Sequence, residues 1–117
     1  MMDVAALIAR MDEQRARWVD LPSGKRVRIR RPLETEFIRF RAGAGVEHVC
    51  EFACDWEGFT EADLLGAAVG ASDEQAFAPE LWSRVVRDRV DYVQPVAKAL
   101  VDAITEHLAA KDAVAKN

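Results

Sequence analysis

The hydrophobic pattern changes period at residues 17–31, which read RWVDLPSGKRVRIRR. The LPSG tetrad at 21–24 is typical of a tight turn, because proline presets φ and glycine permits a positive φ. After the turn the residues alternate, with Val27 and Ile29 on one side and arginines on the other. The stretch therefore predicts a β-hairpin with one basic, solvated face. A two-stranded ribbon is marginal alone, so we expect it to lie on helices or to pair with another strand.

Apolar residues at helical spacing flank the hairpin. Residues 3–17 predict an amphipathic first helix, whose apolar stripe we expect to pack on the domain rather than to form an interaction face. Further helical segments are expected at 32–41, at 46–55, in a short turn at 60–65, from Pro79, and from a cap at Asp91 to about residue 110. We expect one domain over residues 1–117 with a frayed tail at about 111–117. Its class would be α+β, mainly α, with a small β-hairpin (about 17–31) packed on four to five helices.

Charge is strongly segregated along the 117 residues, although the net charge is only −4. Residues 15–41, the basic block, contain nine Lys or Arg and three Asp or Glu, a net +6. Residues 42–82, the acidic block, contain nine Asp or Glu and no Lys or Arg, a net −9. Such a division concerns partners and steering more than the fold. It suggests self-association, in which the opposite blocks of two molecules pair head to tail.

The sequence favours a binding or assembly protein over an enzyme. There is no glycine-rich phosphate loop, nucleophile elbow or Walker lysine. His107 and Glu106 are neighbours on a late helix and point about 100° apart, so adjacency does not make them an acid–base pair. His48, Cys50 and Cys54 lack a fourth ligand for zinc, and we expect no metal or cofactor.

The same features set the expected compartment. No apolar run is long enough to span a bilayer, and no basic cluster precedes an apolar stretch as in a signal peptide. We expect Cys50 and Cys54 to be reduced thiols. The expected location is the cytoplasm.

The row of Arg26, Arg28 and Arg30 is the first candidate surface for a partner. Guanidinium groups about 6.6–6.8 Å apart along a strand could follow phosphates or meet acidic residues of a protein, and a solvated face is the plain alternative. Against nucleic acid stand the overall acidity and the lack of aromatic residues among these arginines, since we expect Trp18 to pack in the core.

The turn at Trp56, Glu57 and Gly58 is the second candidate surface. Trp56 lies between two acidic residues and just before a glycine. We favour Trp56 as a buried anchor of the turn, and the alternative is an exposed aromatic anchor of an interface.

These segments resemble tail assembly chaperones of long-tailed phages. The hairpin sequence LPSGKRVRIR at 21–30 is similar to the opening of those proteins, and DWEGFTEADLL at 55–65 resembles their Trp-x-Gly turn and acidic helix start. Residues 77–89 look like the helix that usually follows. The resemblance covers roughly residues 18–105, and it departs at Val90, where the family often has proline.

The resemblance implies a non-catalytic protein in the host cytoplasm, encoded by a phage or prophage. Such chaperones bind the tape-measure protein and tail-tube subunits during tail morphogenesis, and many have a longer frameshifted product. The alternatives are a small nucleic-acid-binding regulator, with the helices from Pro79 and Asp91 as a helix-turn-helix, and a head–tail joining component of the virion. An enzyme is a third alternative.

Overall fold

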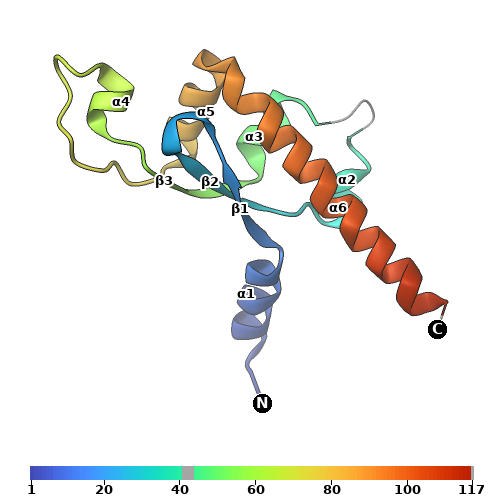
Figure 1. Ribbon diagram of the computed structural model, residues 1–117. Coiled ribbons are helices and arrows are strands. Elements are labelled where there is room, and N and C mark those ends of the chain that lie inside the picture. The colour runs from blue at the N-terminus through green and yellow to red at the C-terminus, as the bar shows by residue number, and fades with distance from the viewer. Residues whose placement is uncertain (41–43, 117) are drawn as a thin grey trace.

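Three antiparallel strands and six α-helices make up the part of the chain that the computed structural model describes, residues 1–40 and 44–116 (Figure 1). The elements in chain order are α1 (Val4–Gln14), β1 (Ala16–Asp20), the 3-10 turn η1 (Pro22–Gly24), β2 (Arg26–Arg30), α2 (Glu34–Phe37), α3 (Val46–Glu51), β3 (Ala53–Glu57), α4 (Glu61–Leu65), α5 (Pro79–Asp88), the 3-10 turn η2 (Val90–Tyr92) and α6 (Val93–Ala115). The α+β, mainly α class expected from the sequence is confirmed.

The predicted hairpin forms from β1 and β2, joined by the LPSG turn. Ser23 and Gly24 have positive φ values of 65° and 73°, which reverse the chain within the turn. The antiparallel register pairs Trp18 with Arg28 and Val19 with Val27. Val27 is fully buried, as the alternation predicted.

β3 corrects the helix that we expected through residue 55. The helix α3 ends at Glu51, and residues 53–57 pair antiparallel with β2, giving the sheet order β1-β2-β3. A bulge on this ladder lets Ile29 pair with Ala53 and Arg28 with Asp55, so Cys54 has no partner across the strand. The free edge of β2 supplies backbone hydrogen bonds that outweigh the helical spacing of the apolar residues in this segment.

The hydrophobic core lies between the sheet and the helices α3, α5 and α6. α5 packs on β3, while α6 packs on β1 and β2. Trp82 of α5 is fully buried, and its indole nitrogen donates to the carbonyl of Val49 at 3.0 Å. Trp56 is 4% exposed and donates to the carbonyl of Gln75 at 2.7 Å. Both indoles thus keep a hydrogen bond inside the core.

The start of the last helix also differs from the expectation. Asp91 was predicted to cap it, but residues 90–92 form a 3-10 turn, and α6 begins at Val93 without a side-chain cap. The aromatic ring of Tyr92 is buried and stacks on Trp82, with 6.4 Å between the centroids, which holds the chain in the turn. α6 extends to Ala115, and the fraying of its end stays a prediction.

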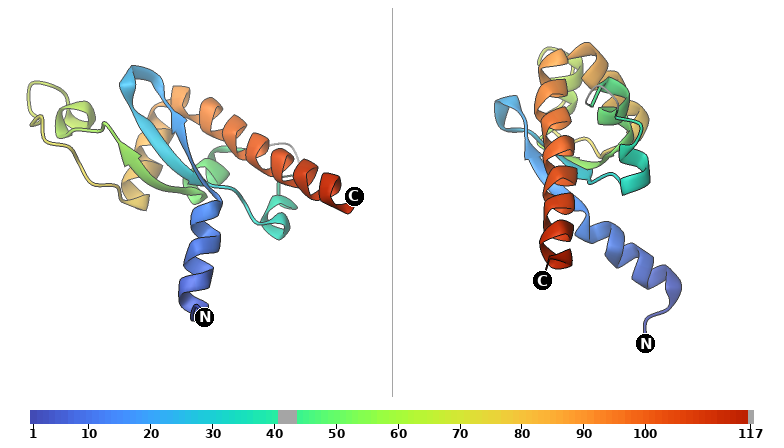
Figure 2. Two further views of the ribbon diagram at one scale, coloured as in Figure 1. Left: turned by 60° about the horizontal axis from the view of Figure 1, so that its bottom comes forward. Right: turned by 90° about the vertical axis from the view of Figure 1, so that its right-hand side faces the viewer.

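The molecule is more extended than its length requires. Its radius of gyration is 16.3 Å, against about 13 Å for a compact domain of this size. The views in Figures 1 and 2 agree that α1 leaves the sheet and runs alone, while the C-terminal half of α6 extends past the core. No helix in the described part is both long and apolar enough to cross a membrane.

Candidate binding surfaces

Arg26, Arg28 and Arg30 lie on the face of β2 that points away from the core, as predicted. Arg26 Nε donates to Glu57 Oε2 at 2.7 Å, and the Arg26 guanidinium lies 4.3 Å from the centroid of the Trp18 ring. The hydrogen bond between Arg26 and Glu57 raises the pKa of Arg26 and lowers the pKa of the Glu57 carboxyl. The first candidate surface is therefore partly occupied by contacts within the chain.

Trp18 was expected in the core and lies instead beside the arginines. Val19 takes the inward position on β1, so the alternation of the strand turns Trp18 outward, opposite Arg28. Trp18 is partly exposed and stacks with Arg26. The arginine face therefore does contain an aromatic residue, contrary to the expectation.

The same sheet face also carries carboxylates that offset the arginines. The ladders pair Arg26 with Asp20 on one side and with Glu57 on the other, and they pair Arg28 with Asp55. Arg26 thus faces two carboxylates and Arg28 faces one, whereas Arg30 pairs with Ala16. Together these three arginines and three carboxylates carry no net formal charge. Opposite charges at cross-strand spacing cancel the field that would attract a phosphate backbone.

The turn at Trp56, Glu57 and Gly58 is divided by the fold. Trp56 is the buried anchor that we favoured, with its ring stacked on Phe59 at 4.1 Å between centroids. Glu57 is exposed and pairs with Arg26. Gly58 has φ +87°, and a Cβ there would lie 3.1 Å from the carbonyl oxygen of Gly24. Of the three, only Glu57 offers a side chain to a partner.

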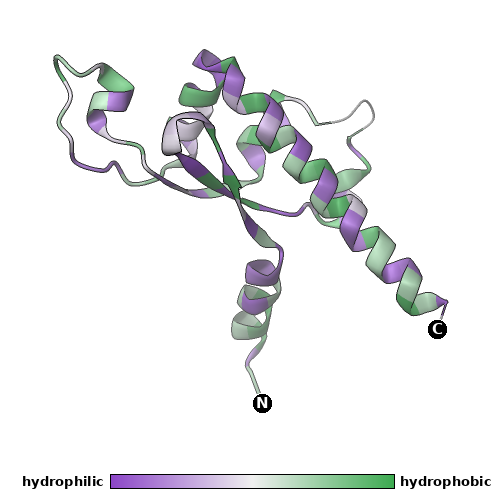
Figure 3. Cartoon of the chain, in the orientation of Figure 1, coloured by the Kyte–Doolittle hydropathy of each residue, from purple (hydrophilic) through white to green (hydrophobic). Residues whose placement is uncertain are grey.

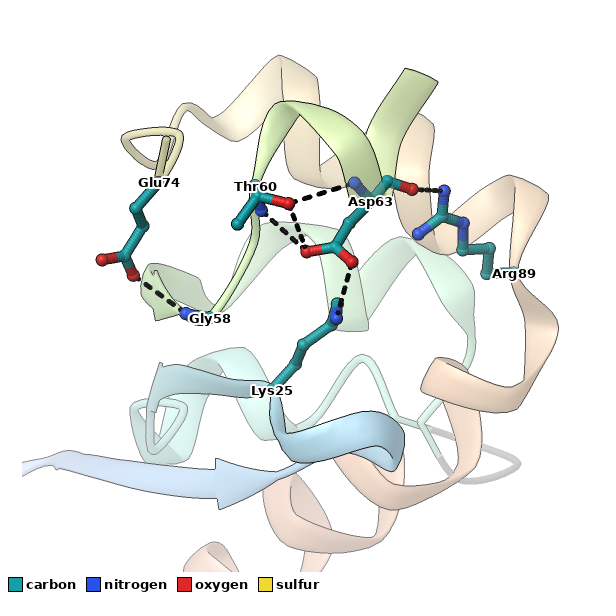
Figure 4. A network of polar contacts seen from close by, with 6 residues as sticks. All are labelled: Lys25, Gly58, Thr60, Asp63, Glu74 and Arg89. Atoms are coloured by element: carbon teal, nitrogen blue, oxygen red, sulfur yellow. Dashed lines mark hydrogen bonds and ion pairs between the residues drawn. The ribbon is translucent and has the colours of Figure 1, made fainter. Parts of the chain in front are cut away.

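A second set of polar contacts joins the hairpin turn to α4 (Figure 4). Lys25 is 9% exposed, and its Nζ lies 3.2 Å from Asp63 Oδ1. Asp63 Oδ2 accepts from the backbone and hydroxyl of Thr60, which completes the predicted capping box. Arg89 donates to the carbonyl of Asp63 at 2.5 Å. These bonds to Thr60, followed by Lys25, hold the pKa of Asp63 below its usual value.

The apolar stripe of α1 is exposed, which overturns the expectation that it packs on the domain. Its members, Val4, Leu7, Ile8 and Met11, are between 50 and 74% exposed, and no residue of α1 is buried. Figure 3 shows the apolar and polar residues of this helix standing clear of the body. Only Arg15 separates α1 from β1, so the chain has no loop in which to fold the helix back.

An open groove of about 570 Å³ lies between α1 and α6, and we call it the α1 groove. Its residues are Ile8, Met11, Asp12, Gln14, Arg15, Arg31, Leu33 and His107. Apolar side chains from α1 and the segment before α2 thus share one depression with cationic ones. In the sequence, the only indication of this groove is the apolar stripe of α1, which we expected to pack on the core.

The charges in the α1 groove are unevenly paired. Arg15 forms an ion pair with Asp12 at 2.9 Å and donates to the carbonyl of Arg31. Arg31 donates to the carbonyl of Pro32 and forms no ion pair with any described carboxylate. The pKa of Arg31 is lowered, chiefly because the side chain is partly buried and also because the like charge of Arg15 lies nearby. His107 pairs with Glu34 at 2.8 Å at the rim.

The cysteines and histidines are dispersed. Cys50 lies in α3 and Cys54 in β3, and both are free thiols. Burial raises the pKa of the Cys54 thiol. His48 Nδ1 accepts from the backbone of Gly45 at the start of α3. In the described part of the chain, no three His, Cys, Asp or Glu side chains are grouped to hold a metal ion.

Comparison with known protein families, curated proteins and solved structures finds no match to this chain.

Proposed function

We propose that this chain is a non-catalytic tail assembly chaperone of a long-tailed phage or prophage. It would act in the host cytoplasm, keep the helical tape-measure protein soluble and recruit tail-tube subunits. Support comes from the resemblance of residues 21–30 and 55–65 to that family. The structural observation that carries the proposal is the exposed apolar stripe of α1 beside the α1 groove.

The stripe fits a protein that holds a helical client. The core is complete without α1, since none of its residues is buried. Leaving Val4, Leu7, Ile8 and Met11 in water forgoes the stabilisation of roughly 1.5–3 kcal/mol that full burial of each such side chain gives. A stripe at helical spacing is the form in which one amphipathic helix meets another. The exposed stripe therefore has the chemistry of a client site.

The outward face of the sheet gives less support to the alternative of a nucleic-acid-binding regulator. Three carboxylates opposite Arg26 and Arg28 offset the charge of the arginine row, and Arg26 is held by Trp18 and Glu57. Phosphate binding depends on cations that are free to displace counterions. A helix-turn-helix is also disfavoured, because α6, which would be the recognition helix, has no basic residue before Lys98.

Co-expression tests the proposal. The client is a tape-measure protein, and its soluble fraction is measured with and without this chain. We expect the soluble fraction to rise several-fold with the wild-type chain and not with Leu7→Glu. Val69→Glu is the matched control, because Val69 is 74% exposed in a loop distant from α1. A client that stays equally insoluble with the wild-type chain would contradict the chaperone proposal. Finding the chain in purified virions would also contradict it and would support a head–tail joining role.

A further inference from the structure

The chain exposes more surface than a compact protein of its mass. Its accessible area is 7729 Å². A compact monomer of 13.0 kDa has about 6,300 Å². The difference of about 1,400 Å² exceeds the roughly 800 Å² that each partner contributes to an interface of standard size. The extra area comes with the projecting α1 and the C-terminal half of α6 (Figure 2), so enough area is present for a stable complex.

The α1 groove is lined by apolar side chains of the kind that contact a helix. Ile8 and Met11 on α1, with Leu33 opposite, supply apolar side chains along it. The 11 residues of α1 span about 16 Å, or three turns. Apolar side chains at i, i+3, i+4 and i+7 form ridges that pack into the grooves between the side chains of a second helix. The opposing surface is therefore expected to be the apolar stripe of an amphipathic helix.

Charge narrows the chemistry of that helix. Arg31 is partly buried in the groove, donates only to a backbone carbonyl, and has no described carboxylate at ion-pairing distance. Arg15 beside it is neutralised by its ion pair with Asp12. Glu34 acts on Arg31 only from beyond ion-pairing distance and is itself paired with His107 and Lys111. A partly desolvated guanidinium is stabilised by a carboxylate, which can accept two of its hydrogen bonds. A lysine in the same place would be repelled.

We propose that the α1 groove binds an amphipathic helix of another protein, in which a carboxylate flanks the apolar stripe and pairs with Arg31. This inference deepens the proposed function and rests on it for the nature of the client. A second copy fits less well. Its α1 carries the carboxylates of Asp12 and Glu13, but both already have partners within their own chain. Asp12 lies 2.9 Å from Arg15 and Glu13 lies 3.8 Å from Arg28, so neither is free to pair with Arg31 of another copy.

Two synthetic peptides test the charge requirement. Each is an amphipathic helix of about 18 residues, or about 27 Å, with the same Leu/Ile stripe. The stripe is flanked by Glu in one peptide and by Lys in the other. Fluorescence anisotropy with the full chain measures both affinities. We expect the Glu-flanked peptide to bind at least about tenfold more tightly, a difference of about 1.4 kcal/mol. Equal affinities would overturn the assignment of the charge.

Point variants place the site. Arg31→Gln is expected to weaken the Glu-flanked peptide about tenfold and to leave the Lys-flanked peptide unchanged or slightly tighter. Arg10→Gln is the matched control, since it removes one positive charge from α1 outside the groove. Met11→Glu should abolish binding of both peptides, whereas Val69→Glu should not. Circular dichroism checks that each variant is folded. Similar losses for Arg10→Gln and Arg31→Gln would overturn the proposal.

The oligomeric state distinguishes a helix of another protein from a second copy of this chain as the occupant of the groove. Sedimentation of the wild-type chain is expected to show a monomer, and a dimer that dissociates in Met11→Glu would assign the groove to a second copy instead. Peptide binding without rescue of the tape-measure protein would leave the helix site standing and contradict the proposed function. Rescue that is unaffected by Arg31→Gln and Met11→Glu would leave the proposed function standing and contradict the helix site in the α1 groove.

Discussion

Lys25 Nζ lies 3.2 Å from Asp63 Oδ1 and connects the turn of the hairpin to the first turn of α4 (Figure 4). The basic block and the acidic block of the sequence meet at this pair. Arg26 with Glu57 and Arg39 with Glu51 join the same two blocks. Charges that are far apart along the chain are thus neutralised within one molecule. The segregation does not require a second molecule, which weakens its use as an argument for head-to-tail self-association.

Asp63 is expected to contribute more to stability than its neighbours in α4. Asp63→Ala removes the two hydrogen bonds that Asp63 Oδ2 accepts from Thr60 and leaves Lys25, which is nearly buried, without its carboxylate. Loss of the carboxylate half of the capping box and of a half-buried ion pair should lower the free energy of unfolding by about 1–2 kcal/mol. Urea unfolding followed by tryptophan fluorescence measures it. Glu61→Ala, in the same helical turn, should cost less than about 0.5 kcal/mol; similar costs would contradict this role.

Acid should remove the contribution of Asp63. Its pKa in the folded chain is lowered from the ordinary value of 3.8, chiefly by the hydrogen bonds from Thr60. A lowered pKa means that the folded state binds the proton more weakly than the unfolded state. The stabilisation is therefore full above the unfolded value and is lost as the pH falls below it.

Urea unfolding at a series of pH values checks this dependence. The difference in unfolding free energy between wild type and Asp63→Asn should stay constant above about pH 5. It should shrink as the pH falls below the ordinary pKa of 3.8. A constant difference for Asp63→Asn down to pH 2–3, by the same linkage, would show that Asp63 is not stabilised as an anion.

The hairpin could be predicted because its signals are local. Pro22 and Gly24 define the turn, and the alternation after Lys25 defines the buried side of β2. The strand β3 could not be read in the same way. Its apolar residues also fit a helical period, and the bulge opposite Arg28 and Ile29 interrupts the alternation that marks a strand. Its conformation is decided by pairing with β2, a contact that the local sequence does not contain.

The site illustrates the same difference. The apolar stripe of α1 was visible in the sequence, but a stripe that packs on the core and one that binds a partner have the same spacing. Their difference depends on the single residue, Arg15, that joins the helix to β1. The offset of the arginines by Asp55 and Glu57 likewise depends on β3, so it was invisible while that segment was assigned to a helix.

Gly58 and Gly24 form a matched pair for testing the close approach of the two turns. Both have positive φ, +87° and +73°. A Cβ on Gly58 would meet the backbone oxygen of Gly24 at 3.1 Å, whereas a Cβ on Gly24 has nothing within 4 Å. We expect Gly24→Ala to cost about 1 kcal/mol of unfolding free energy, from backbone strain alone, and Gly58→Ala about 3 kcal/mol. Equal costs in urea unfolding would show that the turns can separate freely.

The outward face of the sheet predicts weak binding to DNA. Asp20, Asp55 and Glu57 lie opposite Arg26 and Arg28 at cross-strand spacing and offset the charge of the arginine row. Few counterions would therefore be released on contact with phosphates. At physiological salt we expect a dissociation constant above about 10⁻⁴ M for a duplex, the weak end of nonspecific binding. Anisotropy of a labelled duplex over a salt series measures it.

A charge variant makes that measurement decisive. Glu57→Lys frees Arg26 from its ion pair and changes the charge of this face by two units. If the carboxylates are what suppress DNA binding, this variant should bind more tightly than wild type, and its affinity should fall more steeply with salt. Arg26→Gln should have little effect, since Arg26 is already neutralised. Micromolar, steeply salt-dependent binding by the wild-type chain, lost in Arg26→Gln, would instead favour the nucleic-acid-binding regulator.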